Sequence, residues 1–522
     1  MWGSVWSRWG VRVAAASVAA SIPIVAPRPH DESLDIGTNI QCSNYVHPAA
    51  AVAVDKCRKL VQQFKELNGA PGVAIGVSVH GHLVWKEGFG FADVENLRAC
   101  NGDTVMRIAS ISKPVAMTLV AKAWEDGKLD IDAPVQQYVP SFPVKKFNDQ
   151  EVTITSRHLV SHLSGIRHYS RRAGDYYAKP DEKKDNCPKC DQPLPAKRYK
   201  REFAQNEYFN KKQYSTTTEA LDMFKDDPLI AAPGTKFVYT SHGWTLMSAV
   251  LEGAVGVPFD KQLRDMFRQM GMKNTHLDQN NPIIANRARY YRRRIFHRLE
   301  NVPYVNNSYK WAGGGILSSV SDLLRYANIL LYSYQCLNTT TVVPLNSGSR
   351  GTGYERGGRD ESLASILTHC SCATKEEFET KTVHSNPPLI PSFSPGICCP
   401  QPGYLSSETV HKMWTSVPNT ILSCASEEGA YGMGWGVMPP IMGKWGPERP
   451  GYVLHTGGAV GATSILLILP MDENEAKEHC PPRGIAVAVL ANLQECYNIH
   501  GLAIEIANIF KMYSLNTNSV LY

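Results

Sequence analysis

A serine and a lysine three residues apart, Ser110 and Lys113, stand at the start of an apolar run that is compatible with a helix. Residues three apart share one face of a helix, so the Lys113 amine can reach the Ser110 hydroxyl and accept its proton when the amine is neutral. A free lysine has a pKa of about 10.4, so neutrality requires burial beside another cation. The apolar flanks, 105–109 and 114–121, predict a core-facing helix that stops near Gly127. An isolated Ser-x-x-Lys pattern is common on surface helices, so its context decides the interpretation.

Two further motifs follow along the chain. Tyr239-Thr240-Ser241 comes after a Pro-Gly turn and leads into the apolar run 244–251. His455-Thr456-Gly457-Gly458 stands just before the strand-like run 464–469. Taken alone, Tyr239 is most simply an ordinary half-buried aromatic residue. The order of the three motifs favours a catalytic site instead.

In this order the motifs resemble those of the serine beta-lactamase and penicillin-binding-protein superfamily, on its class C and D-aminopeptidase-like branch. Longer phrases resemble the mitochondrial serine beta-lactamase-like proteins of animals; they are 104–113, 163–169, 307–315 and 455–462. The resemblance covers about residues 50–170, 216–335 and 405–512. It implies an α+β, beta-lactamase-like fold, in which an antiparallel sheet from both chain ends is flanked by helices and carries an inserted, mostly helical lobe. The site should lie in the crevice between the lobes.

The resemblance also implies a role for each motif residue. Ser110 would be the acylated nucleophile, and Lys113 its proton acceptor or relay. Tyr239 would be the shared base and the acid that protonates the leaving group, with Lys113 as the cation that makes the phenol acidic enough. The backbone N–H groups of Ser110 and Gly458 would form the oxyanion hole.

The residues expected to bind substrate are Ser241, His455, Thr456 and Gly458. Two of them depart from the family pattern, because His455 stands where many relatives carry lysine and Ser241 where relatives often have asparagine. An unperturbed histidine, with a pKa of about 6.5, is mostly neutral at pH 7. We therefore expect a substrate carboxylate to be held less firmly than in a true beta-lactamase.

Other chemistries have no motif in this sequence. It contains no Gly-x-Ser-x-Gly elbow, no His-Glu-x-x-His zinc helix and no phosphate-binding loop. The one Cys-x-x-Cys pair, Cys187 and Cys190, lacks the second pair that a zinc ribbon needs, so a local disulfide and two free thiols remain equally open. We expect no metal and no cofactor.

The domain organisation follows from apolar runs and charge. Residues 72–79 with 83–85, and 464–469 with 485–490, read as two hairpins, and 499–510 has the spacing of a helix that packs on their sheet. We expect one hydrolase domain over 46–514, interrupted by disordered or surface insertions at 171–215 and 336–404. The first insertion holds twelve Lys or Arg against seven Asp or Glu, which accounts for most of the net charge of +6.

Residues 1–45 are predicted to be a targeting segment and linker, because the segment has arginines at 8, 12 and 28 and no acidic residue before Asp31. The resemblance favours mitochondria, in the intermembrane space, and secretion is the alternative. A second basic run, the arginines between 287 and 298, suits a solvated hairpin better than a surface for nucleic acid or anionic lipid. We expect no nucleic-acid partner.

These observations predict a serine hydrolase that cleaves amide bonds in a peptide or protein through an acyl-enzyme on Ser110. The resemblance further implies an influence on mitochondrial lipid metabolism, proximity to a membrane surface and assembly into homo-oligomers or filaments. An esterase or transacylase of the same fold, acting on small molecules or lipids, is one alternative. A homopolymeric scaffold with a vestigial site is another.

Overall fold

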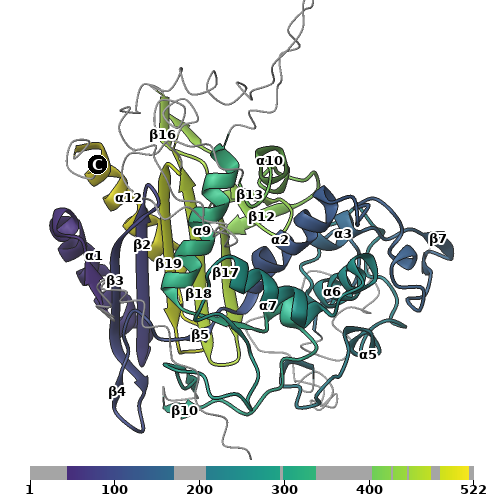
Figure 1. Ribbon diagram of the computed structural model, residues 1–522, viewed down its shortest axis with the longest axis horizontal. Helices are drawn as coiled ribbons and strands as arrows, with labels where there is room; N and C mark the ends of the chain where they lie inside the picture. Colours follow the sequence, from purple (N-terminus) through teal and green to yellow (C-terminus); the bar gives the residue numbers. More distant parts are fainter. Residues whose placement is uncertain are drawn as a thin grey trace, which may run out of the picture. The chain divides into compact units, whose positions relative to one another are not determined.

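A large antiparallel sheet joins the two ends of the chain (Figure 1). The structure is a computed structural model and describes residues 44–169, 207–293, 298–336, 403–424, 427–443, 446–471 and 482–516. The sheet has the strand order β1-β3-β2-β19-β18-β17-β14-β13-β12, with β4 beside β3. Its strands are β1 (Tyr45–Val46), β2 (Gly72–Val79), β3 (His82–Asp93), β4 (Arg98–Ala99), β12 (Ile421–Cys424), β13 (Glu427–Tyr431), β14 (Gly436–Met438), β17 (Tyr452–Ala459), β18 (Ala462–Pro470) and β19 (Gly484–Ala491). The sheet therefore combines segments from both chain ends, which confirms the predicted fold class.

The centre of the sheet is built from the two predicted hairpins. Strands β2 and β3 pair through a tight turn in which His80 and Gly81 both have positive φ angles, 49° and 82°. Strands β18 and β19 pair along their whole length, and β19 pairs with β2. The β2–β19 pairing is what brings the chain ends together.

Both faces of this sheet are covered, so its central strands β2, β18 and β19 are buried along almost their whole length. Helices α1 (Ala51–Asn68) and α12 (Ile499–Asn516) cover one face, and α9 (Val320–Gln335) lies on the other (Figure 1). The α12 face receives the larger side chains of β19, such as Val487 and Val489. The α9 face has small residues, and a Cβ at Gly76 would come within 2.9 Å of Leu324. Small residues therefore let α9 lie close to the sheet.

The described residues between β4 and β12 fold mainly into helices, which form the predicted helical lobe. Its helices are η2 (Ala109–Ile111), α2 (Ser112–Glu125), η3 (Val135–Gln137), α3 (Ser156–Val160), α5 (Thr217–Leu221), α6 (Ser241–Val255), α7 (Phe259–Gln269), α8 (Trp311–Gly314), α9 and α10 (Ser407–Met413); η1 (Pro48–Ala50) precedes α1. The short strands are β5 (Met106–Arg107), β6 (Lys145–Phe147), β7 (Gln150–Val152), β8 (His276–Leu277), β9 (Tyr291–Arg293), β10 (Leu299–Asn301) and β11 (Ile316–Ser318), with β15 (Ile441–Gly443) and β16 (Gly446–Arg449) later in the chain. As predicted, α2 ends just before Gly127, whose φ is 67°.

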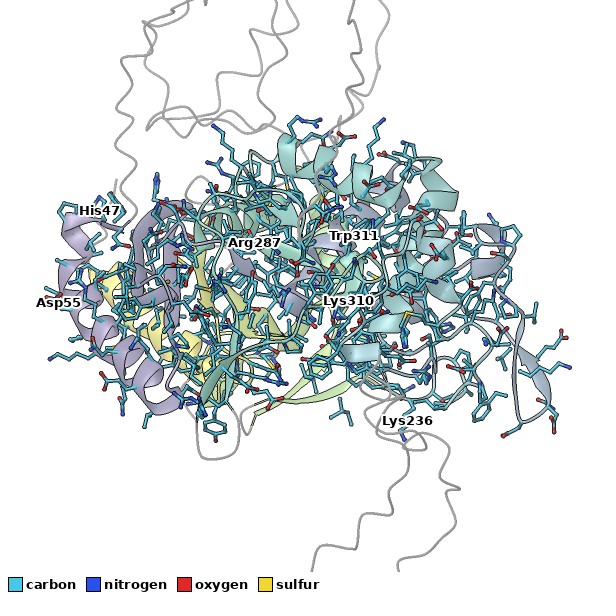
Figure 2. The ribbon with its side chains drawn as sticks, turned by 90° about the horizontal axis from the view of Figure 1, so that it is seen from below. His47, Asp55, Lys236, Arg287, Lys310 and Trp311 are labelled. Atoms are coloured by element: carbon cyan, nitrogen blue, oxygen red, sulfur yellow. The ribbon has the colours of Figure 1, made fainter. Side chains whose placement is uncertain are left out.

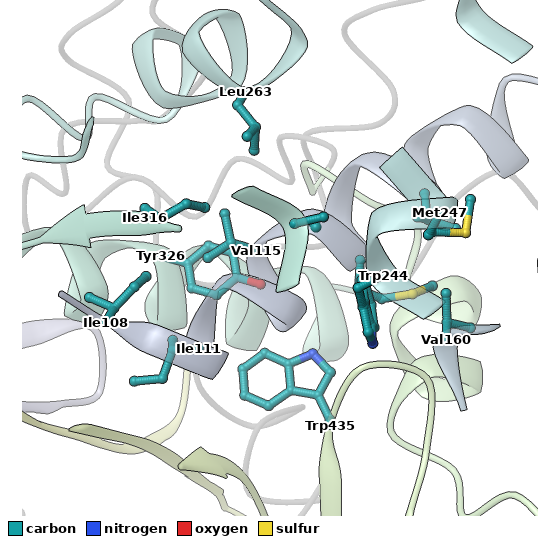
Figure 3. Close-up of a cluster of buried hydrophobic side chains, with 14 of the residues drawn as sticks. Ile108, Ile111, Val115, Val160, Trp244, Met247, Leu263, Ile316, Tyr326 and Trp435 are labelled. Carbon is teal, nitrogen blue, oxygen red and sulfur yellow. The ribbon is translucent and has the colours of Figure 1, made fainter. Parts of the chain in front are cut away.

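Helix α2 lies in the centre of the larger hydrophobic core (Figure 3). Val115 of α2, Trp244 of α6 and Tyr326 of α9 all belong to this core and are fully buried. The Tyr326 ring stacks on Trp435 at 6.3 Å, and its hydroxyl lies 3.0 Å from Thr118 Oγ1 of α2. This packing fixes the start of α2, and therefore the residues that precede it.

Three predicted segments lie largely outside the described residues: the targeting segment up to residue 43, the first insertion from 171 to 206 together with Cys187 and Cys190, and the second insertion from 337 to 402. The described end of the first insertion, 207–215, packs against the domain. Glu207 forms an ion pair with Arg167 at 2.8 Å, and Tyr214 is buried beside Tyr309.

Candidate active site

Ser110 lies in the short 3-10 helix η2, between strand β5 and helix α2. The preceding residue, Ala109, has φ of 50°, a backbone conformation that non-glycine residues seldom adopt. The Ser464 hydroxyl of β18 donates a hydrogen bond to the Ile108 carbonyl at 2.8 Å and ties η2 to the main sheet. The half-buried Ser110 is thus held on a strained turn, a feature often found where a side chain must be presented for chemistry.

The Lys113 amine contacts three oxygen atoms at the start of α2. Its Nζ lies 3.1 Å from Ser110 Oγ, 3.2 Å from Ser241 Oγ and 2.6 Å from the Gly313 carbonyl. A neutral amine has two N–H donors and one lone pair. The Gly313 carbonyl can only accept, and Ser241 can accept the second N–H, so the lone pair remains for the Ser110 hydroxyl.

The surroundings of Lys113 favour the neutral amine. Its side chain is fully buried, and the structure shows no ion pair for it among the residues described. Burial, followed by the nearby positive charge of Lys310, lowers the pKa of Lys113 well below its ordinary value of 10.5. The two conditions inferred from the sequence, burial and a second cation, are therefore both present.

The Tyr239-Thr240-Ser241 segment is held by two histidine rings. His162 Nδ1 accepts the Thr240 N–H and His168 Nδ1 accepts the Ser241 N–H, each at 3.1 Å. The Thr240 hydroxyl caps α6 by accepting the Gly243 N–H, so Ser241 is the first residue of that helix. Burial raises the pKa of Tyr239 above its ordinary value, and a hydrogen bond with Ser110 only partly offsets this. Tyr239 is consequently a neutral phenol beside Ser110.

His455 lies on β17, and both of its ring nitrogens have partners. Its Nδ1 lies 2.7 Å from the Thr456 carbonyl, and its Nε2 lies 2.9 Å from the Tyr431 hydroxyl. Because a carbonyl can only accept, Nδ1 carries the proton and Nε2 accepts from Tyr431. Burial, followed by Lys113, lowers the pKa of His455 to about 3. His455 therefore presents no positive charge at neutral pH.

Two glycines of β17 allow the strand to run beside η2. A Cβ at Gly457 would lie 2.2 Å from Ser464 Oγ and 2.5 Å from the Ile108 carbonyl, so only glycine fits there. Gly458 is exposed, and a Cβ built on it would meet nothing within 4 Å. The described part of β14 pairs with β17 only up to Leu454, which leaves this stretch of β17 next to η2.

The structure places the Lys113 amine within hydrogen-bonding distance of Ser110 and Ser241 and 4.8 Å from the centre of the Tyr239 ring. His455 lies on strand β17. Sequence reasoning missed the Gly313 carbonyl and the Tyr431 hydroxyl, which fix Lys113 and His455. A glycine-rich loop after Trp311 was the only signal for the first, and no pattern in the sequence indicated the second.

The basic run between 287 and 298 is largely paired within the chain. Arg287 forms an ion pair with Asp278 at 2.8 Å, Arg289 with Asp93 at 3.3 Å and Arg292 with Glu300 at 2.6 Å. These contacts fit the predicted hairpin, which β9 and β10 form. Among the described residues, no three His, Cys, Asp or Glu side chains gather in a way that could hold a metal ion. The same residues contain no helix long and apolar enough to cross a bilayer.

Comparison with known proteins identifies the family of the chain. A family model described as Beta-lactamase matches residues 57–363. Together with the fold and the Ser110–Lys113 pair, this match shows that the chain belongs to the beta-lactamase family of serine hydrolases. Within it, the chain is similar to the human "Serine beta-lactamase-like protein LACTB, mitochondrial", with 38% identity over 492 residues, which are 88% of this chain and 79% of that protein.

Solved structures share the fold at low sequence identity. The octameric penicillin-binding protein homologue from Pyrococcus abyssi matches with a TM-score of 0.56 and 20% identity, over 89% of this chain and 77% of that one. EstCE1, a hydrolase with promiscuous acyltransferase activity, matches with a TM-score of 0.58 and 16% identity, over 88% of this chain and 99% of that one. At these identities the likeness shows the fold alone.

Proposed function

We propose that the chain is a serine peptidase that cleaves amide bonds through an acyl-enzyme on Ser110. The observation that carries this proposal is the Lys113 amine, whose two N–H groups are directed to acceptors and whose remaining lone pair is left for Ser110 Oγ. No acid pairs with Lys113 in the described structure, so burial shifts its protonation equilibrium towards the neutral amine. A neutral amine at 3.1 Å is a base within reach of the hydroxyl proton.

In the first step Ser110 Oγ attacks the substrate carbonyl carbon while its proton passes to Lys113. The carbonyl oxygen becomes an oxyanion, which the backbone N–H groups of Ser110 and Gly458 stabilise. Gly458 suits this role because the space around its Cα is open. The C–N bond then breaks as the leaving nitrogen receives a proton, and an ester on Ser110 remains for water to hydrolyse.

Tyr239 acts in this scheme as the acid. Its buried phenol keeps its proton at neutral pH and forms a hydrogen bond with Ser110, so it can donate to the leaving nitrogen. The Lys113 ammonium, 4.8 Å from the centre of the Tyr239 ring, then restores the charge balance as its proton returns towards the phenolate. The role of shared base, which would need a cationic Lys113 beside the phenol, passes to Lys113 itself.

Esterase or transacylase activity on small molecules is the second candidate. The observation that favours it is the absence of charge on His455, because an uncharged ester needs no cation at β17. The same acyl-enzyme would serve both reactions, and EstCE1 shows that a protein of this fold can transfer acyl groups. The nature of the leaving group separates the two candidates.

A labelling experiment followed by a substrate panel tests the proposal. A fluorophosphonate should modify Ser110, identified by peptide mass spectrometry, and Ser110→Ala should lose both labelling and turnover while it keeps the same circular dichroism spectrum. Cleavage of a peptide library by the unchanged chain would support the peptidase, and turnover of p-nitrophenyl esters without any peptide cleavage would support the esterase. Full peptide cleavage by the Ser110→Ala chain would refute both.

We further propose a mitochondrial location, in the intermembrane space, and assembly into homo-oligomers. The first is supported by the arginine-containing, acid-free start of the chain and by the word mitochondrial in the names of the human, mouse and cow relatives. Assembly into homo-oligomers is supported by the octameric state of the archaeal homologue, which is a property of that protein. Protease protection in isolated mitochondria and sedimentation velocity of the purified chain test the two separately.

A further inference from the structure

Lys310 is a second buried lysine of this site, and in the reaction described above it acts only through its charge, which lowers the pKa of Lys113. It caps α8, and its carbonyl accepts the N–H groups of Gly313 and Gly314 at 3.0 and 2.8 Å. Gly313 is the residue whose carbonyl holds Lys113. The backbone of one short turn therefore connects the two lysines.

The Lys310 ammonium lies among three tyrosine rings. Its Nζ is 5.4 Å from the centre of the Tyr169 ring, 5.7 Å from Tyr208 and 5.3 Å from Tyr309, distances at which a cation is attracted to an aromatic face. Only 6% of the residue is exposed, yet the described structure gives its ammonium no hydrogen bond and no ion pair. With only rings around it, the ammonium has no hydrogen-bond acceptor among the described residues.

Two acidic side chains in this region, Asp278 and Glu207, are already paired with arginines. Asp278 accepts from Arg107 at 2.7 Å, from Arg287 at 2.8 Å and from Asn307. Glu207, whose backbone carbonyl accepts from the Tyr309 hydroxyl, gives its carboxylate to Arg167. Asp278 favours the charged form of Lys310, but no carboxylate among the described residues forms an ion pair with it, which leaves the ammonium open to an anion that comes with a ligand.

We propose that Lys310 binds a carboxylate of the substrate and so determines specificity beside Ser110. The inference rests on the proposed function, because it assigns a substrate group to the same site. His455 cannot provide this contact, since Tyr431 and the Thr456 carbonyl occupy both of its nitrogens. The three tyrosine rings hold the Lys310 ammonium in position, and its three N–H donors and its charge remain available to a ligand.

Binding measurements on the full chain test this without depending on turnover. In a Ser110→Ala background, which cannot consume the ligand, calorimetry would compare N-acetyl-Ala-Ala with its C-terminal amide. We expect the acid to bind about tenfold more tightly, as one charge-assisted hydrogen bond can provide. N-acetyl-Ala-Asp amide, whose only carboxylate is on a side chain, distinguishes a terminal from a side-chain carboxylate.

Three variants test whether Lys310 is the residue responsible for the preference for the acid. Lys310→Met removes the charge at similar length and should reduce the preference for the acid to less than about twofold, whereas Lys310→Arg should keep most of it. The matched control is Lys236→Met, because Lys236 is exposed and lies at the periphery, away from Lys310 (Figure 2). That control should leave the preference unchanged.

The pH dependence keeps the test valid if Lys310→Met fails to fold. Burial, followed by the charge of Arg107, lowers the pKa of Lys310 to about 8, and Asp278 opposes this. The preference for the acid should therefore fall as the pH rises from 7 to 9.5. The titratable and charged groups around the ammonium are Arg107, Lys113, Asp278, Tyr169, Tyr208 and Tyr309.

Equal binding of acid and amide by the Ser110→Ala chain would overturn the proposal, as would a preference that survives in Lys310→Met. Failure of the proposed function is a different result. It would appear as absence of fluorophosphonate labelling in the chain that retains Ser110, while the comparison of acid and amide would still decide the role of Lys310.

Discussion

Two sides of the candidate site differ in how their nitrogen atoms are used. On the α2 side, the Lys113 amine lies within 3.2 Å of three oxygens, one of which is the proposed nucleophile. On the β17 side, the His455 ring gives one nitrogen to the Thr456 carbonyl and the other to Tyr431. The first arrangement keeps a basic lone pair next to Ser110, and the second leaves nothing for a ligand. The proposed groups for acyl transfer therefore lie together on the α2 side, while His455 on the β17 side is neutral.

Loss of the Lys113 amine should have the largest effect. Lys113→Met keeps a long apolar side chain but removes the proposed base, the amine that the described structure places 3.1 Å from Ser110 Oγ, so we expect fluorophosphonate labelling to slow by about 10²–10⁴-fold. The matched control is Lys122→Met on the same helix, where the lysine is 44% exposed and pairs with Asp126. Equal labelling rates for the Lys113→Met and Lys122→Met chains would show that Lys113 is not the base.

The two glycines of β17 should respond differently to the same substitution. Gly457→Ala places a methyl group 2.2 Å from Ser464 Oγ and 2.9 Å from the Ala109 Cβ, so η2 and β17 must separate. We expect it to lower the free energy of unfolding by about 1–3 kcal/mol and to slow Ser110 labelling. Gly458→Ala meets nothing within 4 Å and should unfold at nearly the same urea concentration as the unchanged chain. Equal urea midpoints for both variants would show that the two segments are not packed this closely.

A cation placed at β17 should reduce the difference between the two sides. We expect the unchanged chain to hydrolyse benzylpenicillin poorly, because His455 offers no charge to the drug's carboxylate. His455→Lys should improve kcat/KM for benzylpenicillin about tenfold, the equivalent of one modest charge-assisted contact. Efficient hydrolysis by the unchanged chain, with no gain in the variant, would mean that this residue does not govern recognition.

The smallest expected effect is on stability in acid. The pKa of His455 falls from 6.5 in the unfolded chain to about 3 in the fold, so below pH 6.5 the unfolded chain binds a proton that the folded chain does not. Stability from this group is present above pH 6.5 and is lost as the pH falls towards 3, by about 1 kcal/mol over the first unit. His455→Gln should show a shallower decrease of Tm between pH 6.5 and 5.5. A decrease as steep as in the unchanged chain would assign the acid sensitivity to other buried histidines.

Local spacing made part of this site predictable. Ser110 and Lys113 are three residues apart on one helical turn, and the apolar runs 72–79 and 485–490 each indicated one strand of a hairpin. The contacts that set protonation states were not predictable. Gly313 is 200 residues from Lys113, and a backbone carbonyl carries no signal in its residue type. Tyr431 and His455 lie on different strands of the sheet, and only their pairing showed that the ring is fully occupied.

The central claim is that Lys113 is neutral when substrate arrives, and the pH profile of Ser110 labelling tests it most directly. The rate of modification by an uncharged fluorophosphonate would be measured from pH 5 to pH 11, with the Ser110→Ala chain as the blank. Because burial and Lys310 lower the pKa of Lys113, the rate should rise with pH and reach its plateau well below the ordinary lysine value of about 10.4. A rate that continues to rise through pH ~10, as an unperturbed lysine would give, would contradict the account.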